Sequence, residues 1–433
     1  MNINVMGLGK LGFPMASFLS AKHNVQCFDL NHKLVDLLKK NSKSYLPNEI
    51  GINRYLKKKI KIFNDAQESL LETKISFITV PTPSLENGKF SNKFILSVLD
   101  DIAHHIKNNI RIKKNKDISP YIININSTVS PGSFSKELVP YMERKGLKIN
   151  KDYHFIYNPY FVALGNVIEN LEKPDFILIG HSSEKALNEI KKLYANIYKK
   201  PKIKSMNLEE AELVKLLVNC YVASKISFTN FVKDITDKFK ITSASRVLDA
   251  IGTDKRVGNN FFKPGGPFLG PCLPRDTIAL KKFCEEINIE PLIPITTNKI
   301  NNLSITKIYE TLNEIRNMKF KNIGFIGTGY KPNTDFFEES IAYKIMKKAK
   351  KLKFKVCYFD RFIKKDHNEF KRFNNIKDLI KISDVIFISY HDPYIKRIKK
   401  NFKKKNFIWD IYNVVNSDKI KKFSSITELK NLK

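Results

Sequence analysis

Short, mainly apolar runs recur along the first 200 residues, each followed by a polar turn. Such runs, four to eight residues long, are typical of strands buried on both faces of a parallel sheet. A helix to about Ala21 is predicted after the first run. We expect the last run to close the sheet. The predicted strands are Ile3–Met6, Val25–Phe28, Lys74–Val80, Tyr121–Asn126 and Asp175–Gly180.

The middle of the chain has a different pattern, because the residues from Met206 to Ala250 include neither glycine nor proline. Asn207 can cap a helix, and the acidic residues after it suit the positive end of a helix dipole. We predict one long connecting helix here. Pro291 and Pro294 mark a later break between two more predicted helices, from past Asp276 to about Ile287 and from about Asn298 to Asn317.

Apolar runs return in the last third of the chain. They predict strands at Lys321–Ile326, Lys355–Phe359, Asp384–Ser389 and Asn406–Trp409. The predicted fold class is therefore α/β, with two Rossmann-like doubly wound domains joined by a helical central region that contains a long connecting helix. We expect an N-terminal domain at 1–203, a central domain at 204–318 and a C-terminal domain at 319–433.

The turn after the first predicted strand reads Gly7-Leu-Gly9-Lys10-Leu11-Gly12, and the second strand ends at Asp29. This is the spacing of a dinucleotide fingerprint. Its first glycine makes the turn, its second admits the pyrophosphate, and its third lets helix and strand pack. An acid at the position of Asp29 binds ribose hydroxyls and favours NAD over NADP. Lys33 is a further candidate contact for the adenosine end, although an exposed lysine is the simpler interpretation.

Polar loops follow two more strands, at the edge where open α/β sheets bind ligands. They are Val80-Pro81-Thr82-Pro83 and Ser127-Thr128. In the predicted long helix, Lys215 and Asn219 lie four residues apart inside an apolar segment, and so on one face. Burial of an unpaired lysine and amide is costly. A lysine in such surroundings suits proton transfer.

The segment Lys263–Asp276 is rich in glycine and proline, which excludes helix and central strand and predicts a loop. It contains Cys272, followed by Arg275 and Asp276. A nearby cation lowers the pKa of a thiol, and the thiolate is a nucleophile. A surface loop with an incidental cysteine is the alternative.

The composition bears on the binding partners of the protein and on the compartment in which it works. The 433 residues carry a net charge of +33, which suits nucleic acid, a membrane surface or an anionic small molecule, or reflects a general lysine-rich composition. No nucleic-acid motif accompanies the charge, and no apolar run is long enough for a membrane span. Five scattered cysteines suit a reducing compartment. We expect a soluble cytoplasmic protein that binds neither nucleic acid nor membrane.

Taken together, these motifs resemble those of the nucleotide-sugar 6-dehydrogenases, the UDP-glucose/GDP-mannose dehydrogenase family, over essentially the whole chain. The resemblance rests on their order as much as on any one of them. In sequence they are Gly7–Gly12, Val80–Pro83, Ser127–Val129, Asn158–Phe161, Glu212–Lys215 with Asn219, Pro264–Asp276, and Tyr330–Asp335 with Glu339 and Ser340.

The resemblance implies an oxidation of C6 of a sugar, most simply that of UDP-glucose, to the carboxylate by two NAD in succession, for polysaccharide biosynthesis. It implies that Cys272 forms the thiohemiacetal and thioester, that Lys215 and Asn219 act at the oxidised carbon, and that Asp276 and Thr128 assist the water. It further implies cofactor contacts from the two strand-end loops, the Gly7–Gly12 turn, Asp29, Lys33 and Arg275, a homodimer, and no metal. Substrate contacts are expected at Tyr160, Phe161, Lys215, Asn219, Arg256, Phe268, Leu269, Gly270 and Lys331.

Several positions differ from the family pattern. Tyr160 and Leu164 stand where the family has glutamates, and Glu338 replaces an arginine. A tyrosine is no carboxylate base at neutral pH. A homologue with impaired activity and a binding or regulatory role is therefore one alternative. UDP-N-acetylhexosamine or GDP-mannose as the substrate is another, and a two-electron dehydrogenase of the 6-phosphogluconate type, which needs no cysteine loop, is a third.

Overall fold

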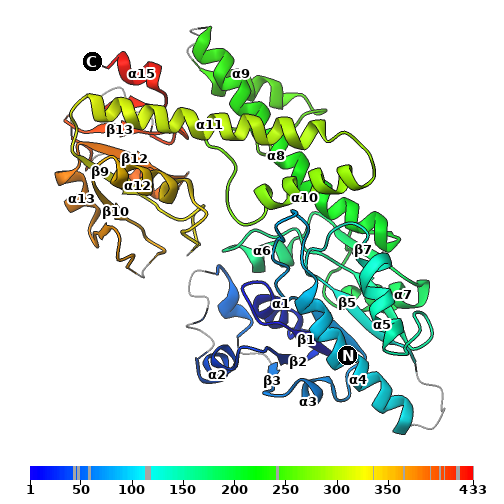
Figure 1. Cartoon of the computed structure of the whole chain (residues 1–433). Helices are drawn as coiled ribbons and strands as arrows, with labels where there is room; N and C mark the ends of the chain where they lie inside the picture. Colours follow the sequence, from blue (N-terminus) through cyan, green and yellow to red (C-terminus); the bar gives the residue numbers. More distant parts are fainter. Residues whose placement is uncertain are drawn as a thin grey trace. The chain divides into compact units, whose positions relative to one another are not determined.

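The computed structural model forms two compact units, residues 1–217 and 218–433 (Figure 1). Each unit contains one parallel or mainly parallel sheet, and the long helix α8 (Leu208–Lys238) contains the division between them. The predicted fold class is confirmed. The structure describes residues 1–41, 45, 49–56, 60–112, 119–239, 243–334, 336–363, 366–390, 392–398, 401–403, 405–415 and 420–432.

The sheet of the first unit has eight strands in the order β3-β2-β1-β4-β5-β6-β7-β8, parallel except between β6 and β7. Its strands are β1 (Asn2–Met6), β2 (Asn24–Phe28), β3 (Ile60–Ile62), β4 (Ile75–Ile78), β5 (Tyr121–Ile125), β6 (Tyr153–Tyr157), β7 (Ile177–His181) and β8 (Ile203–Met206). The prediction that the run ending at Gly180 closes the sheet is wrong, because β8 pairs outside β7. Only Ile203 and Met206 of β8 are apolar, and neither is fully buried, so the strand has a weak sequence pattern.

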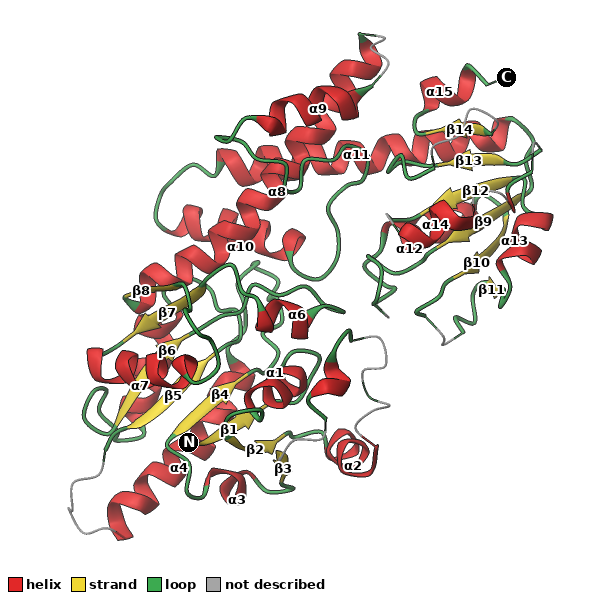
Figure 2. Ribbon diagram, turned by 180° about the vertical axis from the view of Figure 1, so that it is seen from behind, coloured by secondary structure: helices red, strands yellow, loops and turns green. Residues whose placement is uncertain are grey.

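Helices cover both faces of this sheet (Figure 2). They are α1 (Gly12–Leu19), α2 (His32–Asn41), the 3-10 helix η2 (Ile52–Arg54), α3 (Ala66–Leu70), α4 (Lys93–Ile112), the π-helical turn η3 (Phe134–Leu138), α5 (Val139–Arg144), α6 (Val167–Glu172) and α7 (Glu184–Ala195). Successive strand side chains point to opposite faces. Ile75 and Phe77 of β4 accordingly join one core, with α1, α6 and α7, and Ile78 joins the other, with α4 and η3.

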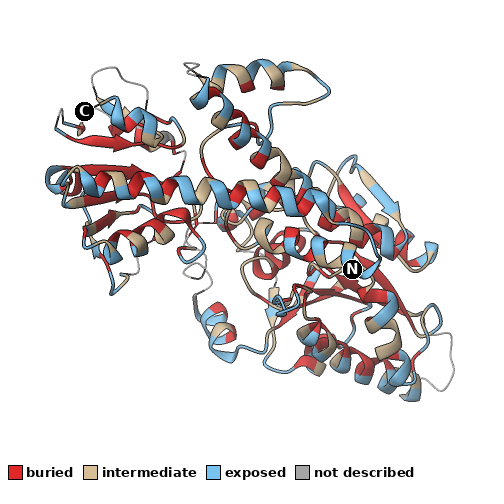
Figure 3. Ribbon diagram, turned by 45° about the horizontal axis from the view of Figure 1, so that its top comes forward, coloured by how far each residue is buried: buried red, intermediate tan, exposed pale blue. Residues whose placement is uncertain are grey.

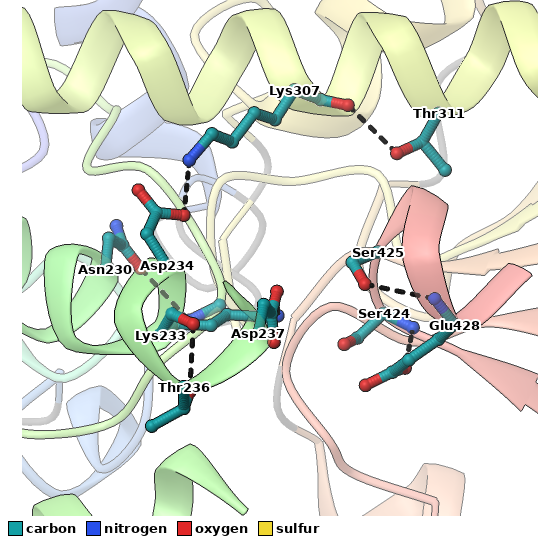
Figure 4. Close-up of polar contacts among 11 residues, drawn as sticks. Asn230, Lys233, Asp234, Thr236, Asp237, Lys307, Thr311, Ser424, Ser425 and Glu428 are labelled. Atoms are coloured by element: carbon teal, nitrogen blue, oxygen red, sulfur yellow. Dashed lines mark hydrogen bonds and ion pairs between the residues drawn. The ribbon is translucent and has the colours of Figure 1, made fainter. Parts of the chain in front are cut away.

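The second unit begins with helices: the rest of α8, α9 (Ala244–Thr253), α10 (Leu273–Glu286) and α11 (Leu292–Asn317). The predicted long connecting helix is confirmed as α8, but its predicted extent to about Ala250 is wrong. The helix ends at Lys238, and the side chain of Ser243 caps a new helix by accepting from Arg246 N. An ion pair between Lys307 and Asp234 joins α11 to α8 (Figure 4).

Two other helix starts differ from the prediction. The predicted loop from Lys263 to Asp276 ends at Cys272, because α10 begins at Leu273. Likewise α11 begins at Leu292 instead of about Asn298. In both helices a proline, Pro274 or Pro294, lies in the first turn, where backbone N–H groups have no partner within the helix. Proline therefore marked the helix starts rather than breaks in the chain.

The sheet of the second unit has six parallel strands in the order β11-β10-β9-β12-β13-β14. Figure 3 shows the strands of both units mostly buried. Helices α11 and α12 share one core with Phe325, and α13 and α14 share another with Ile326. The elements are β9 (Asn322–Ile326), α12 (Ile341–Lys351), β10 (Lys355–Phe359), β11 (Lys371–Arg372), α13 (Ile376–Ile382), β12 (Val385–Ile388), α14 (Pro393–Ile398), β13 (Phe407–Trp409), β14 (Lys421–Phe423) and α15 (Ile426–Lys430).

One turn recurs in both units. In the first, Leu8 N, just after β1, donates to Asp29 Oδ2 at 2.6 Å, and Asp29 follows β2. In the second, Thr328 N, just after β9, donates to Asp360 Oδ2 at 2.6 Å, and Asp360 follows β10. A carboxylate at the end of the second strand thus holds the turn after the first strand in each sheet.

Candidate active site

The glycine turn between β1 and α1 is tightly closed. Gly7 has a φ of +94°, a conformation that favours glycine. A Cβ atom on Gly12 would lie 1.9 Å from the carbonyl oxygen of Gly7, so only glycine fits there, whereas a Cβ on Gly9 would meet nothing within 4 Å. The turn therefore leaves open space at the middle glycine, where the fingerprint brings a pyrophosphate close to the backbone.

The other predicted cofactor residues of the first unit lie at the same edge of the sheet. Lys10 and Leu11 lie in the turn, partly buried, and Lys33 is exposed in α2. Asp29 accepts from the backbone N–H groups of Leu8 and Asn31, at 2.6 and 2.8 Å. Oδ2 thus holds the glycine turn and Oδ1 holds the chain just after β2, and each oxygen has capacity for another donor.

The two polar loops at strand ends are joined to each other. Ser127 Oγ donates to Val80 O at 2.6 Å, and Thr82 Oγ1 donates to Thr128 O at 2.7 Å. Pro81 and Pro83 are exposed beside them. The loops after β4 and β5 therefore form one surface, as predicted from the strand ends, with the side chain of Thr128 partly exposed on it.

Lys215 is held by the segment that follows β6. Its Nζ donates to Tyr160 O at 2.9 Å and lies 4.6 Å from the ring centroid of Phe161. Only 8% of the residue is exposed. A buried ammonium needs such partners, because it loses its hydration. The sequence correctly indicated a buried lysine in α8.

Glu212, one turn before Lys215, is fully buried. Its oxygens accept from Gly132 N at 2.6 Å and Phe134 N at 3.0 Å, in the segment after β5. Burial raises the pKa of this carboxyl group to about 7, against the opposing effect of the backbone donors. The sequence showed Glu212 as an acid near a helix start, and its anchoring role was missed.

In the second unit, Asn219 and Asp276 form a direct contact. Asn219 Nδ2 donates to Asp276 Oδ2 at 2.6 Å, and Arg275 Nε lies 3.4 Å from Asp276 Oδ1. Asp276 N donates to the carbonyl oxygen of Cys272, which is the residue that precedes α10. The exposed thiol of Cys272 and the buried carboxylate of Asp276 are therefore one helical turn apart.

Two asparagines that sequence reasoning missed hold the cysteine loop. Asn230 of α8 donates to Gly266 O and accepts from Gly265 N, at 3.0 and 3.1 Å. Asn301 of α11 binds both backbone groups of Phe268, at 2.8 and 3.0 Å. An amide can satisfy a backbone N–H and a C=O at once. A polar residue on an apolar helix face is the only sequence signal of such anchors.

The loop also packs against the sheet part of the second unit. A Cβ on Gly265 would lie 1.7 Å from Ile411 O, and Gly270, with a φ of +86°, lies against the ring of Tyr330. Leu269 packs on the core that contains Phe325. These contacts leave little freedom to the loop that precedes Cys272.

The remaining candidate residues of the second unit lie at the surface. The Arg256 side chain is 88% exposed and pairs with Asp254. Lys331 is partly exposed, with its Nζ 5.8 Å from the Tyr330 ring centroid, and Glu338 is exposed. Asp335, the last residue of the Tyr330 motif, lies outside the described residues.

Two Rossmann-like sheets, one with a dinucleotide turn, are the architecture of a nucleotide-dependent dehydrogenase. Three family models identify which one. The NAD-binding domain of the UDP-glucose/GDP-mannose dehydrogenase family matches residues 1–198, its central domain matches 209–303, and its UDP-binding domain matches 324–417. The chain belongs to this family, whose members are NAD-dependent oxidoreductases, and its cofactor is NAD.

Comparison with individual relatives supports the same family assignment. A UDP-glucose 6-dehydrogenase of Rickettsia prowazekii is 29% identical over 98% of this chain and 97% of its own. One of Rickettsia felis is 30% identical over 80% of this chain and 75% of its own. Among solved structures, a UDP-glucose dehydrogenase from Pyrobaculum islandicum has a TM-score of 0.86 at 22% identity, covering 98% and 97% of the chains. A UDP-D-ManNAc dehydrogenase from Pyrococcus horikoshii has 0.83 at 22%, covering 99% and 100%.

No helix in the described part of the chain is long and apolar enough to cross a membrane.

Proposed function

We propose that this protein oxidises C6 of a nucleotide sugar, with UDP-glucose as the first candidate, from the alcohol to the carboxylate. The observation that carries the proposal is the arrangement at the start of α10, where Cys272 precedes the helix and Asp276, one turn on, is bound by Asn219. A nucleophilic thiol with a carboxylate and an amide beside it suits acyl chemistry. The UDP-binding domain supports a uridine nucleotide as the carrier.

When held at the β1–α1 turn, NAD would supply the hydride acceptor for each of the two oxidations. The alcohol loses a hydride and a proton to give an aldehyde. The thiolate of Cys272 adds to the aldehyde carbon, and loss of a second hydride turns the thiohemiacetal into a thioester. Water then releases the carboxylate and restores the thiol. The balance is one alcohol, two NAD⁺ and one water to one carboxylate, two NADH and three protons.

We assign the roles around Cys272 as follows. Lys215 and Asn219 stabilise negative charge on the sugar oxygen, since both can donate N–H hydrogen bonds from one face of α8, and they steer the proton of the alcohol toward water. Asp276 and Thr128 orient the hydrolytic water. We further assign sugar-nucleotide contacts to Phe161, Phe268, Leu269, Gly270 and Lys331, and a cofactor contact to Arg275.

The test is the amount of NADH formed when limiting UDP-glucose meets the enzyme and excess NAD. We expect two NADH per sugar, and a Cys272→Ala variant that cannot complete the second oxidation. The matched control is Cys284→Ala, which changes a partly buried cysteine within α10. Two NADH per sugar from Cys272→Ala would contradict the thioester route.

Tyr160 supports a second candidate, a homologue with impaired turnover that acts as a binding or regulatory protein. The family pattern has a carboxylate at this position, and the hydroxyl group here instead binds Tyr194. One NADH per active site followed by a stall favours this candidate. NADH formed only with N-acetylhexosamine or mannose nucleotides would instead change the substrate and keep the reaction.

We also propose a homodimer formed through the central helices at 204–318. Five large apolar side chains are exposed along one face of α8 and its end, and an uncovered face of this size favours association. They are Tyr221, Phe228, Phe231, Ile235 and Phe239. Exposed Arg256 is then available to reach the partner's sugar. Sedimentation velocity of the wild type and of Ile235→Glu tests this, and a monomeric wild type at micromolar concentration contradicts it.

The five free cysteines suit a reducing compartment, and on that ground we propose the cytoplasm as the location.

A further inference from the structure

The position of the Lys215 ammonium depends on a segment without regular structure. Nζ of Lys215 donates to the carbonyl oxygen of Tyr160 and lies over the ring of Phe161. Both residues belong to the segment 158–161, which follows β6. Any movement of this segment would therefore displace the partners that hold the ammonium.

Hydrogen bonds to the neighbouring strands hold the start of the segment. Asn158 N donates to Ile125 O at 2.9 Å, and its side chain donates to Leu178 O at 2.7 Å. Asn126 Nδ2 donates to Asn158 O at 2.7 Å. These three bonds all end on Asn158 and leave Tyr160, two residues later, to be fixed by something else.

Tyr194 of α7 supplies that link, because its hydroxyl group binds both Asn158 and Tyr160. It donates to Asn158 Oδ1, whose amide nitrogen is already engaged with Leu178 O, and it lies 2.8 Å from the hydroxyl of Tyr160. A phenol has one proton. The Tyr194 O–H group donates its one hydrogen bond to Asn158, so in the second hydrogen bond Tyr160 must donate to the Tyr194 oxygen.

These two hydrogen bonds form a chain, which we call the relay. Along it each hydroxyl group donates to the next residue, from Tyr160 to Tyr194 to Asn158. Tyr194 is 1% exposed, and burial raises the pKa of both phenols, which keeps both donors protonated. The Tyr160 side chain also packs against the core formed with α1, α6 and α7. Its hydroxyl group thus points into the first unit, and its carbonyl group binds Lys215.

We propose that Tyr194 is a positioning residue for Lys215, acting through the hydroxyl of Tyr160 on the main-chain carbonyl that holds the ammonium. The inference rests on the proposed function only in giving Lys215 a role at the sugar. It assigns Tyr160 a purpose different from that of the carboxylate in the family pattern. Here the residue fixes the lysine instead of handling a water.

The test compares Tyr194→Phe and Tyr160→Phe with Tyr198→Phe as the matched control. Tyr198 lies just beyond α7, and its hydroxyl group donates to Leu171 O, outside the relay. The first measurement is the rate at which trinitrobenzenesulfonate modifies Lys215, followed by peptide mass spectrometry. We expect both relay variants to be modified several times faster than the wild type, and Tyr198→Phe to match it.

The second measurement is steady-state NADH formation. Loss of one hydrogen bond in the relay is expected to lower kcat by roughly two- to tenfold, with KM for the sugar nucleotide unchanged. The double variant Tyr160→Phe/Tyr194→Phe is expected to be no slower than Tyr194→Phe alone, since both changes remove one shared bond. Fully additive losses would overturn the relay.

Tyr160→Phe separates a general loss of stability from mispositioning of Lys215. This variant keeps the hydrogen bond between Tyr194 and Asn158 and loses only the one between Tyr160 and Tyr194. Equal modification rates in Tyr160→Phe, Tyr194→Phe and Tyr198→Phe would overturn the proposal. Since modification needs no turnover, faster modification in an enzyme that forms no NADH from any nucleotide sugar would retain the relay and reject the proposed function. Unchanged modification of Lys215 in variants of an enzyme that forms NADH would reject the relay and retain the proposed function.

Discussion

The side-chain amide of Asn219 donates to the carboxylate of Asp276 at 2.6 Å, which joins α8 to the first turn of α10. Asp276 is 2% exposed. A buried carboxylate has lost most of its hydration and depends on each donor around it. The contact therefore serves both the stability of the helix pair and the geometry beside Cys272.

Replacement of Asn219 by alanine removes this donor. We expect the free energy of unfolding to fall by about 1.5–3 kcal/mol, the usual cost for a hydrogen bond to a charged group, and NADH formation to fall with it. Urea unfolding measures the first effect. The control is Asn298→Ala, whose side chain accepts from the neutral Thr277 hydroxyl at 2.9 Å. Equal losses in the two variants would show that the charge of Asp276 is irrelevant.

Two glycines of the β1–α1 turn separate cofactor binding from folding. A Cβ on Gly9 meets nothing, so Gly9→Ala is expected to keep the thermal midpoint and to weaken NAD binding by at least about tenfold, as a methyl group blocks the pyrophosphate. Gly12→Ala is expected to lower the thermal midpoint and to weaken NAD binding, because the new Cβ would overlap the carbonyl oxygen of Gly7. Calorimetric titration with NAD measures the first effect. Unchanged affinity in Gly9→Ala would place the pyrophosphate elsewhere.

Restoring the glutamate of the family pattern at position 160 is not expected to raise the rate. The new side chain loses the bond to the Tyr194 hydroxyl and brings a carboxylate against an apolar core. We expect Tyr160→Glu to lower the free energy of unfolding by about 1–3 kcal/mol and to turn over no faster than Tyr160→Phe. A rate above wild type would mean that position 160 faces the reacting sugar.

Glu212 makes stability depend on pH. Burial raises its pKa in the folded state from 4.5 to about 7, so the folded protein binds the proton more tightly than the unfolded chain. The stabilisation from this group is complete below about pH 4.5 and is lost as the pH rises through 7, by up to about 3 kcal/mol. Urea unfolding from pH 5 to pH 8 is the measurement.

Glu212→Gln removes this titration and isolates its contribution from that of other groups. We expect the excess stability of the wild type over the variant to shrink as the pH rises across this range. A constant difference would show that the carboxyl group is ionised throughout.

Much of the fold could be predicted from sequence, because buried parallel strands appear as apolar runs. The strand β6 (Tyr153–Tyr157) was not predicted although it is fully buried, whereas the other errors concern elements whose residues have weak patterns. β8 is short and partly exposed, and its place beside β7 depends on pairing between distant segments. Pro294 was interpreted as part of a break and Pro274 as part of a loop, although proline is well tolerated in the first turn of a helix.

The sequence predicts the candidate site as a set of positions, and the contacts between those positions could not be predicted from it. Apolar surroundings indicated that Lys215 is buried, but its partner is a carbonyl group 55 residues away in the chain. Asn230 and Asn301 bind the cysteine loop through backbone groups, which no residue pattern specifies. Tyr194 and Tyr160 meet only because α7 packs beside the segment after β6.

The carboxylate-held turn that recurs at Asp29 and Asp360 has a consequence for the timing of catalysis. Each sheet has its own turn of this kind. The matched NAD-binding domain contains one of the turns, and the matched UDP-binding domain contains the other. In the proposed reaction NADH can then be exchanged for NAD while the partly oxidised sugar stays bound through its nucleotide. A reactive aldehyde need never escape into solution between the two oxidations.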